Sequence, residues 1–150
     1  MYVDAGEIVG LIGPNGAGKT TLFEIISGFT RPSSGRVSFL GSDISSLGPV
    51  SRARRGLGRT FQSAQLFPSL TVLETVLVAL GRGRGSHDES RARQLLDEFG
   101  IGSYTLTRVG SLPTGLRRVL EMTCAFAARP SLVLLDEPTA GLSSAEREDF

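Results

Sequence analysis

The segment Gly13–Thr20 constrains the fold of this chain more than any other feature. It reads Gly-Pro-Asn-Gly-Ala-Gly-Lys-Thr and fits the pattern G-x-x-x-x-G-K-[ST]. The apolar run at residues 7–12 before it has the character of a strand, and residues 19–28 after it have the apolar spacing of a helix. Because a phosphate-binding loop needs a strand before it and a helix after it, these flanks favour that loop over an ordinary Gly-rich turn.

The segment predicts a cradle for a polyphosphate. Its glycines let the backbone turn tightly and aim N–H groups inward, and the helix that follows adds its positive N-terminal end. Lys19 would reach the β and γ phosphates, and the Thr20 hydroxyl would ligate Mg²⁺. The candidate nucleotide-binding residues here are Gly13, Pro14, Asn15, Gly16, Ala17, Gly18, Lys19, Thr20 and Thr21.

A second candidate site follows the apolar run at residues 131–135, which ends in Asp136-Glu137-Pro138. This pattern is typical of a buried parallel strand that delivers a carboxylate to the carboxyl edge of a sheet, where α/β sheets bind ligands. Asp136 would then hold the magnesium beside Thr20, and Glu137 would orient and deprotonate an attacking water. The alternative is a plain strand end that carries two solvated acids.

The rest of the chain predicts an alternation of short strands and helices. Strands are expected at residues 36–40 and 56–59, and the second of these leads into Thr60-Phe61-Gln62. Helices are expected at residues 49–55, 70–80, 89–99 and 119–128. Thr71 and Glu74 form a capping-box pattern at the start of the second helix. Leu112-Pro113-Thr114-Gly115 precedes the last helix.

The order of these elements resembles the nucleotide-binding domain of ABC transporters over essentially the whole chain. The phosphate loop comes first, followed by Gln62, the Leu-x-x-Gly element at residues 112–115 and the apolar strand that ends in Asp-Glu-Pro. Within that superfamily, the loop, Phe61-Gln62 with residues 66–74, and residues 112–115 look like the ATP-binding subunits for branched-chain amino acid uptake.

The resemblance implies an α/β fold of the P-loop NTPase class. We expect a RecA-like parallel sheet core, an antiparallel β segment and an inserted ABC helical subdomain, incomplete at both ends. Residues 1–150 would form one partial ATP-binding domain, with a core at about 1–68 and 117–150 and a helical subdomain at about 69–116. The family's adenine-stacking aromatic residue and switch histidine are not matched, because Tyr2 is too close to the loop and His87 lies in a predicted loop.

The resemblance also implies residue roles. Lys19, Gln62 and Glu137 would be catalytic, and Thr20, Gln62 and Asp136 would hold the metal. Leu112 and Gly115 lie in the place of the signature sequence, which covers the nucleotide of a second subunit. Here Pro113 replaces a serine, Thr114 a glycine and Leu116 a glutamine, so two donors are lost, because proline has neither a hydroxyl nor an N–H. Ala140–Ser143 matches the D-loop, with serine where aspartate is common.

The function that the resemblance implies is ATP hydrolysis, with ATP and Mg²⁺ as cofactors, that energises an importer for branched-chain or other hydrophobic amino acids. The partners would be membrane-spanning permease subunits, a second ATP-binding subunit and, indirectly, a substrate-binding protein. The subunit would lie peripherally at the cytoplasmic face of the cell membrane. The alternatives are a nucleotide-dependent dimerisation module with little or no hydrolysis, and a non-transport ABC ATPase.

Composition agrees with these expectations. The net charge of +1 offers no broad basic excess, so we expect no nucleic-acid partner. The single cysteine, Cys124, lies in an apolar helical stretch and is expected to be a buried thiol. Leu66, Phe67 and Leu70 crowd apolar groups after Gln62, either as packing between subdomains or as a groove for a helix of the membrane-spanning subunit.

Overall fold

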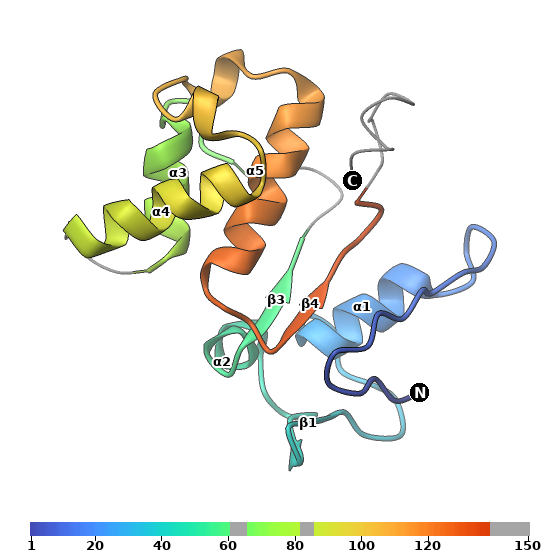
Figure 1. The fold of residues 1–150 in the computed structure, drawn as a ribbon. Helices are drawn as coiled ribbons and strands as arrows, with labels where there is room; N and C mark the ends of the chain where they lie inside the picture. Colours follow the sequence, from blue (N-terminus) through green and yellow to red (C-terminus); the bar gives the residue numbers. More distant parts are fainter. Residues whose placement is uncertain (61–65, 82–85, 139–150) are drawn as a thin grey trace. The chain divides into compact units, whose positions relative to one another are not determined.

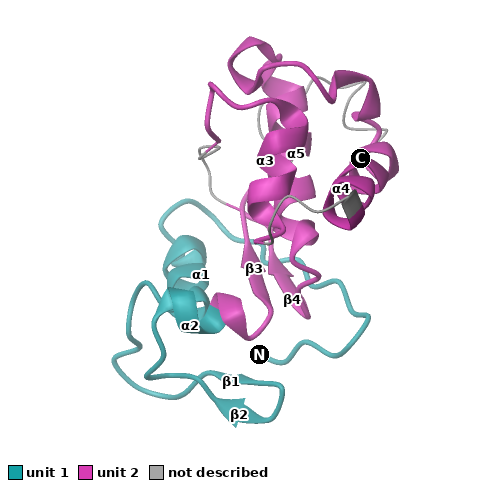
Figure 2. Cartoon of the chain, turned by 90° about the vertical axis from the view of Figure 1, so that its left-hand side faces the viewer, with its two compact units in different colours: residues 1–52 teal, residues 53–150 magenta. Residues whose placement is uncertain are grey.

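The computed structural model describes residues 1–60, 66–81 and 86–138. It divides into two compact units, Met1–Arg52 and Ala53–Phe150, which Figure 2 colours separately. The expected division into a core and an inserted helical subdomain stays a prediction.

Unit 1 contains the helix that follows the phosphate loop. α1 (Lys19–Ser27) ends at Gly28, whose φ of 86° lets its N–H reach the carbonyls of Glu24 and Ile25. The guanidinium of Arg52 donates from Nη1 to the carbonyl oxygens of Ile25 at 2.6 Å and Ile26 at 2.8 Å. The last carbonyls of α1 are therefore satisfied by a buried cation, which also matches the negative end of the helix dipole. The sequence prediction of a helix at this place is confirmed.

The antiparallel segment of unit 1 is a short hairpin. β1 (Ser38–Phe39) pairs with β2 (Ser42–Asp43) in the register Ser38↔Asp43 and Phe39↔Ser42. The two turn residues, Leu40 and Gly41, have φ values of 49° and 75°, the double positive φ that a two-residue type I′ hairpin requires. The strand expected at residues 36–40 is therefore observed only as Ser38–Phe39, and Leu40, the last residue of the expected strand, belongs to the turn.

The predicted strand at residues 7–12 is wrong for this structure, in which the segment has no regular secondary structure. Ile8 is 100% exposed and Ile12 is 95% exposed. A strand persists only where its N–H and C=O groups pair with a neighbour. Within the part of unit 1 that is described, the only paired strands are β1 and β2. Apolar sequence alone therefore does not hold this segment extended.

Unit 2 is built around a parallel pair of strands. β3 (Leu57–Arg59) pairs with β4 (Leu132–Leu134) in the register Leu57↔Leu132, and Figure 1 shows the two side by side. The strands come from distant parts of the sequence, and the helices between them supply the crossover that parallel pairing needs. The expected strands at 56–59 and before Asp136 are confirmed.

Three helices of unit 2 pack together, and Figure 1 shows them as one group. They are α3 (Val72–Ala79), α4 (Ser86–Glu98) and α5 (Thr114–Ala127). α2 (Pro49–Arg54) spans the boundary between the units, and two single turns, η1 (Gly102–Tyr104) and η2 (Val109–Ser111), join α4 to α5. The hydrophobic core of unit 2 includes the buried apolar residues Val72, Val76, Leu95, Leu96, Ile101, Leu112 and Leu120.

The helix boundaries follow local chemistry. Thr71 accepts a hydrogen bond from the backbone of Glu74 while the Glu74 carboxylate accepts from the Thr71 N–H, so the predicted capping box is confirmed. α5 begins at Thr114, five residues before the expected start. Pro113 stands just before it, where the missing N–H costs nothing because the first N–H groups of a helix have no partner within it.

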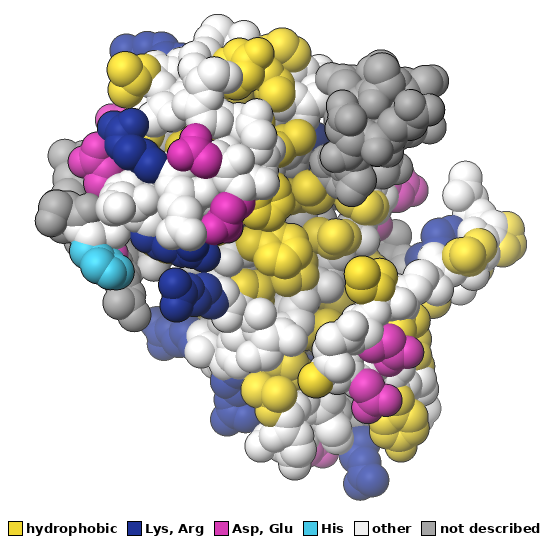
Figure 3. Space-filling view, viewed as in Figure 1, with side chains coloured by type: hydrophobic (Ala, Val, Ile, Leu, Met, Phe, Trp, Pro, Cys, Tyr) yellow, Lys and Arg dark blue, Asp and Glu magenta, His cyan; other side chains and the backbone are white. Residues whose placement is uncertain are grey.

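The surface of unit 2 mixes charges of both signs. On the face drawn in Figure 3, basic and acidic side chains are interspersed over α4, where Arg93 lies 2.8 Å from Glu89. None of the helices within residues 1–60, 66–81 and 86–138 is long and apolar enough to cross a membrane.

Candidate functional site

The loop of unit 1 curls around the ammonium of Lys19. Lys19 Nζ donates to the carbonyl oxygens of Gly13 at 2.6 Å and Pro14 at 2.9 Å, and the Ala17 N–H donates to Pro14 at 3.2 Å. Gly16 and Gly18 have φ values of 82° and 87°, in the left-handed region that glycine adopts without strain. Gly16 and Gly18 are therefore required by the turn itself.

The loop delivers its backbone to the N-terminus of α1. Gly18 is the N-cap, no side chain caps this end, and the first turn holds no acidic residue. The first N–H groups of a helix have no partner within the helix, and they carry the positive end of its dipole. Thr20 is exposed, and a Cβ added at Gly16 or Gly18 would meet nothing within 4 Å. These residues fit a polyphosphate, which needs donors, positive charge and room.

Asp136 lies just beyond the end of β4 in unit 2 and is only 9% exposed. Its N–H donates to Thr60 Oγ1 at 3.1 Å, and its Oδ2 lies 3.7 Å from Arg59 Nη2. Arg59 ends β3 and Thr60 follows it, so the carboxyl ends of both parallel strands hold the acid. The Arg59 guanidinium offsets the cost of burying this carboxylate.

Glu137 differs from its neighbour in exposure and backbone. Its side chain is exposed, and its φ is 47°. A non-glycine residue in the left-handed region carries a cost of about 1–2 kcal/mol, so surrounding contacts must hold it there. The turn places an exposed carboxylate immediately after a buried one, which is the arrangement that a metal ligand and a general base would need.

Arg118 on α5 contacts the backbone of this turn, and sequence reasoning missed it. Its Nη2 donates to the carbonyl oxygens of Asp136 at 2.6 Å and Glu137 at 2.8 Å. Its Nη1 lies 2.6 Å from the Glu121 carboxylate, and both side chains of this pair are under 10% exposed. The sequence did contain a signal for it. Arg118 and Glu121 lie three residues apart on a largely apolar helix, where buried charges have to be paired.

The segment in the place of the signature sequence is partly buried. Leu112 packs in the core of unit 2, and its carbonyl accepts from Arg117 Nε at 2.9 Å. Gly115 is also buried, whereas Pro113 and Thr114 are exposed at the start of α5. The predicted roles of Leu112 and Gly115 in binding a nucleotide stay predictions.

The structure thus describes the predicted site in two parts. The loop lies in unit 1, whereas Asp136 and Glu137 lie in unit 2 with Arg59, Thr60 and Arg118. Gln62 and the segment 140–143 fall outside the described residues. The catalytic, nucleotide-binding and metal-binding roles of all these residues stay predictions.

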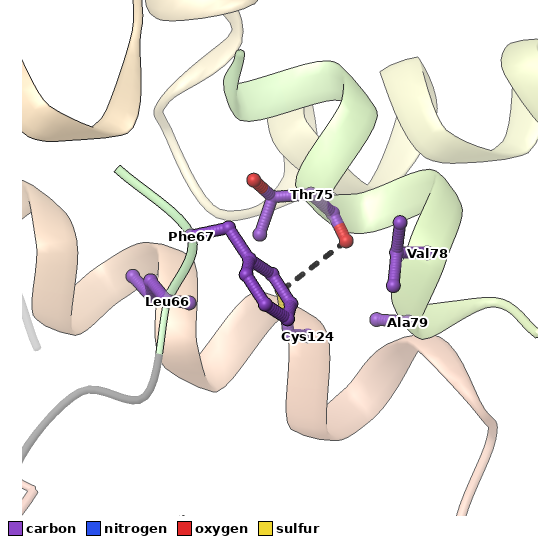
Figure 4. A pocket seen from close by; sticks show the side chains of 6 residues that line it. All are labelled: Leu66, Phe67, Thr75, Val78, Ala79 and Cys124. Carbon is purple, nitrogen blue, oxygen red and sulfur yellow. Dashed lines mark hydrogen bonds between the residues drawn. The ribbon is translucent and has the colours of Figure 1, made fainter. Parts of the chain in front are cut away.

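A small apolar cavity lies elsewhere in unit 2, between α3, α5 and the segment before α3. It has a volume of about 140 Å³ and is lined by Leu66, Phe67, Thr75, Val78, Ala79 and Cys124, as Figure 4 shows. The Cys124 thiol donates to the Thr75 carbonyl at 4.0 Å. Burial raises the pKa of Cys124 to about 12, which keeps the thiol protonated and poorly reactive. Both interpretations of Leu66 and Phe67, packing and docking groove, stay open.

Comparison with known families matches nearly the whole chain to a single family. The family model described as ABC transporter matches residues 1–140. Among curated proteins, the lipopolysaccharide export ATP-binding protein LptB of Haemophilus influenzae is 40% identical over 100% of this chain and 64% of its own length. The branched-chain amino acid transport ATP-binding protein BraF of Pseudomonas aeruginosa is 35% identical over 100% of this chain and 66% of its own length. The chain therefore spans about two thirds of these relatives or slightly less.

Solved structures agree with the fold. CbiO1 of Clostridium perfringens, part of the ABC transporter complex CbiONQ, matches 99% of this chain and 61% of its own chain with a TM-score of 0.85 and 30% identity. The ATP-binding cassette MJ0796, solved as a dimer in a post-hydrolysis state with ADP and Pi, matches 99% of this chain and 68% of its own with a TM-score of 0.84 and 28% identity. The expected α/β fold of the P-loop ATPase class is confirmed.

Proposed function

We propose that this chain, which belongs to the ABC transporter family, binds Mg-ATP and hydrolyses it to energise a membrane transporter. The observation that carries the proposal is the loop of unit 1, in which Lys19 Nζ lies 2.6 Å from the Gly13 carbonyl at the uncapped N-terminus of α1. Such a loop concentrates backbone donors and one cation where a triphosphate would bind.

Each residue of the proposed site has a separate task. Lys19 and the N–H groups of the loop bind the β and γ phosphates and orient them for in-line attack. Thr20 and Asp136 would hold Mg²⁺, which neutralises phosphate charge when it is bound. Glu137 takes the proton of the attacking water, because its carboxylate is exposed beside the buried Asp136. Gln62 would sense the metal and that water.

The proposed assembly contains two ATP-binding subunits. Residues Leu112 to Leu116 of one copy would cover the nucleotide of the other, and membrane-spanning permease subunits would bind both at the cytoplasmic face of the membrane. Two comparisons support this assembly: MJ0796 was solved as a dimer, and CbiO1 is part of a transporter complex. The mixed surface charge over α4 supports the expectation that nucleic acid is not a partner.

For the transported solute, we favour uptake of branched-chain or other hydrophobic amino acids. The match to BraF at 35% identity and the motif resemblance support this choice. The match to LptB at 40% identity favours a second candidate, export of lipopolysaccharide. A strain that lacks the gene should lose uptake of labelled leucine and keep normal lipopolysaccharide at its surface. The reverse result would assign the chain to export.

Replacement of the proposed general base tests hydrolysis. Glu137→Gln should lower kcat for ATP hydrolysis roughly a hundredfold or more, because a general base contributes about that factor. ATP binding should be retained, since the loop of unit 1 is untouched. The matched control is Glu89→Gln, which removes an exposed carboxylate that pairs with Arg93 on α4. Phosphate release and ATP affinity are measured for all three proteins.

Two results would change the proposal. Equal hydrolysis by Glu137→Gln and the parent would remove Glu137 from the catalytic role. A parent that binds ATP and dimerises but does not hydrolyse it would favour the dimerisation module instead.

A further inference from the structure

The turn at Asp136 and Glu137 has a geometry that its own sequence does not favour. In an extended strand, consecutive carbonyl groups point to opposite sides. Here the carbonyls of Asp136 and Glu137 both accept from one nitrogen, Arg118 Nη2, at 2.6 and 2.8 Å. They converge because Glu137 has a φ of 47°, although the residue before a proline favours the extended region. An external contact therefore has to fix this conformation.

Arg118 has the chemistry to fix it. A guanidinium is planar and presents several donors in a rigid fork, so one group can bind acceptors in two directions. The Glu121 carboxylate accepts from Nη1 at 2.6 Å, which orients the fork and neutralises its charge. Both side chains are over 90% buried, at 6% exposure for Arg118 and 7% for Glu121. Water therefore competes little for these bonds.

The helix that carries Arg118 also carries the segment in the place of the signature sequence. α5 begins at Thr114, and Arg118 lies one turn further along the same helix. The backbone of the acidic turn is thus tied to the first turns of α5 by side-chain bonds rather than by chain connectivity, since Asp136 lies eighteen positions after Arg118.

We infer that Arg118, oriented by Glu121, is a positioning residue that holds the Asp136–Glu137 turn and so aims the Glu137 carboxylate. This inference rests on the proposed function for its catalytic consequence. The contacts of Arg118 include the two backbone carbonyls of the turn and the Glu121 carboxylate. It acts through the two backbone carbonyls, and its loss should lower kcat while it leaves the KM for ATP nearly unchanged.

The test removes the pair without leaving a buried charge. Arg118→Met combined with Glu121→Met deletes the bonds to both carbonyls and replaces two charges by apolar groups of similar size. Arg118→Lys is the second variant, because one ammonium cannot reproduce the fork but keeps the charge. The matched control is Arg93→Met with Glu89→Met, which removes an exposed arginine–glutamate pair from α4. Circular dichroism checks that each protein is folded.

Two readouts are compared for every variant. Amide hydrogen exchange of Asp136 and Glu137, measured without nucleotide, should be at least roughly tenfold faster in both Arg118 variants and unchanged in the control. The kcat for ATP hydrolysis should fall at least roughly tenfold, with the KM for ATP within about threefold of the parent. If the double variant does not fold, Arg118→Lys alone decides.

The outcomes separate the inference from the proposed function. Unchanged exchange at Asp136 and Glu137 in a folded variant overturns the structural part of the inference. Faster exchange with parental kcat overturns the catalytic part. A parent that neither binds nor hydrolyses ATP overturns the proposed function, and the catalytic part falls with it. The exchange measurement then still decides whether Arg118 holds the turn.

Discussion

At the scale of single residues, Arg52 and Gly28 together close the end of α1. Arg52 is 1% exposed, and besides the α1 carbonyls it binds the Leu47 carbonyl through Nε at 2.8 Å and the Ser45 carbonyl through Nη2 at 3.1 Å. Burial lowers the pKa of Arg52, and the charge of Asp43 opposes this shift. Gly28 makes room for the guanidinium, because a Cβ there would lie 2.8 Å from Arg52 Nε.

Replacing Gly28 tests this close approach. Gly28→Ala should lower the free energy of unfolding by about 2–4 kcal/mol, the sum of a left-handed alanine and an overpacked contact. Gly35→Ala is the matched control, since its φ of 80° imposes the same backbone strain but nothing lies within 4 Å of an added Cβ. Its cost should be about 1–2 kcal/mol. Urea unfolding compares them, and equal losses would show that the contact with Arg52 does not matter.

Sequence reasoning proposed site residues where the pattern is local. The loop Gly13–Thr20 and the pair Asp136-Glu137 carry their pattern in adjacent positions, so a motif was sufficient. Arg52, Arg118 and Thr60 act on backbone groups distant in sequence, and nothing marks Arg52 apart from its exposed neighbour Arg54. Which arginine becomes buried is decided by tertiary packing, which a single sequence does not display.

At the scale of elements, the contrast between local pattern and tertiary packing explains why the helices were predicted correctly and the strand at residues 7–12 was not. A helix closes its hydrogen bonds within a few residues, so α1, α3 and the end of α5 follow from spacing and caps. A strand depends on a partner elsewhere in the chain. The segment 7–12 has the composition of a strand but no paired neighbour in the described part of unit 1.

The start of α3 offers a direct test at this scale. Thr71→Ala removes the side chain that accepts from the Glu74 N–H at 3.2 Å and should lower the free energy of unfolding by about 1 kcal/mol. Thr71→Ser should restore most of the loss, because serine caps equally well. Ser69→Ala, an exposed neighbour, is the control. Chemical denaturation would contradict the assigned cap if Thr71→Ala and Ser69→Ala had the same small effect.

At the scale of the whole molecule, the fold and family are shown over nearly all of the chain, because the family match covers residues 1–140. The chain spans 64% of LptB from Haemophilus influenzae and 66% of BraF, so transport and its solute depend on experiments with partner subunits. What this chain should do by itself is bind Mg-ATP at the loop. A ligand that binds only the folded state should also raise its stability.

Isothermal titration calorimetry of ATP in the presence of Mg²⁺ tests that claim most directly. A sample shown by circular dichroism to be folded should bind one ATP per chain. Lys19→Ala should weaken this binding at least roughly tenfold, since charge-assisted hydrogen bonds of about 1.5–3 kcal/mol are lost and 1.4 kcal/mol is a factor of ten. No binding by the folded parent, or equal affinity for parent and Lys19→Ala, would contradict the assignment of the loop as the ATP site.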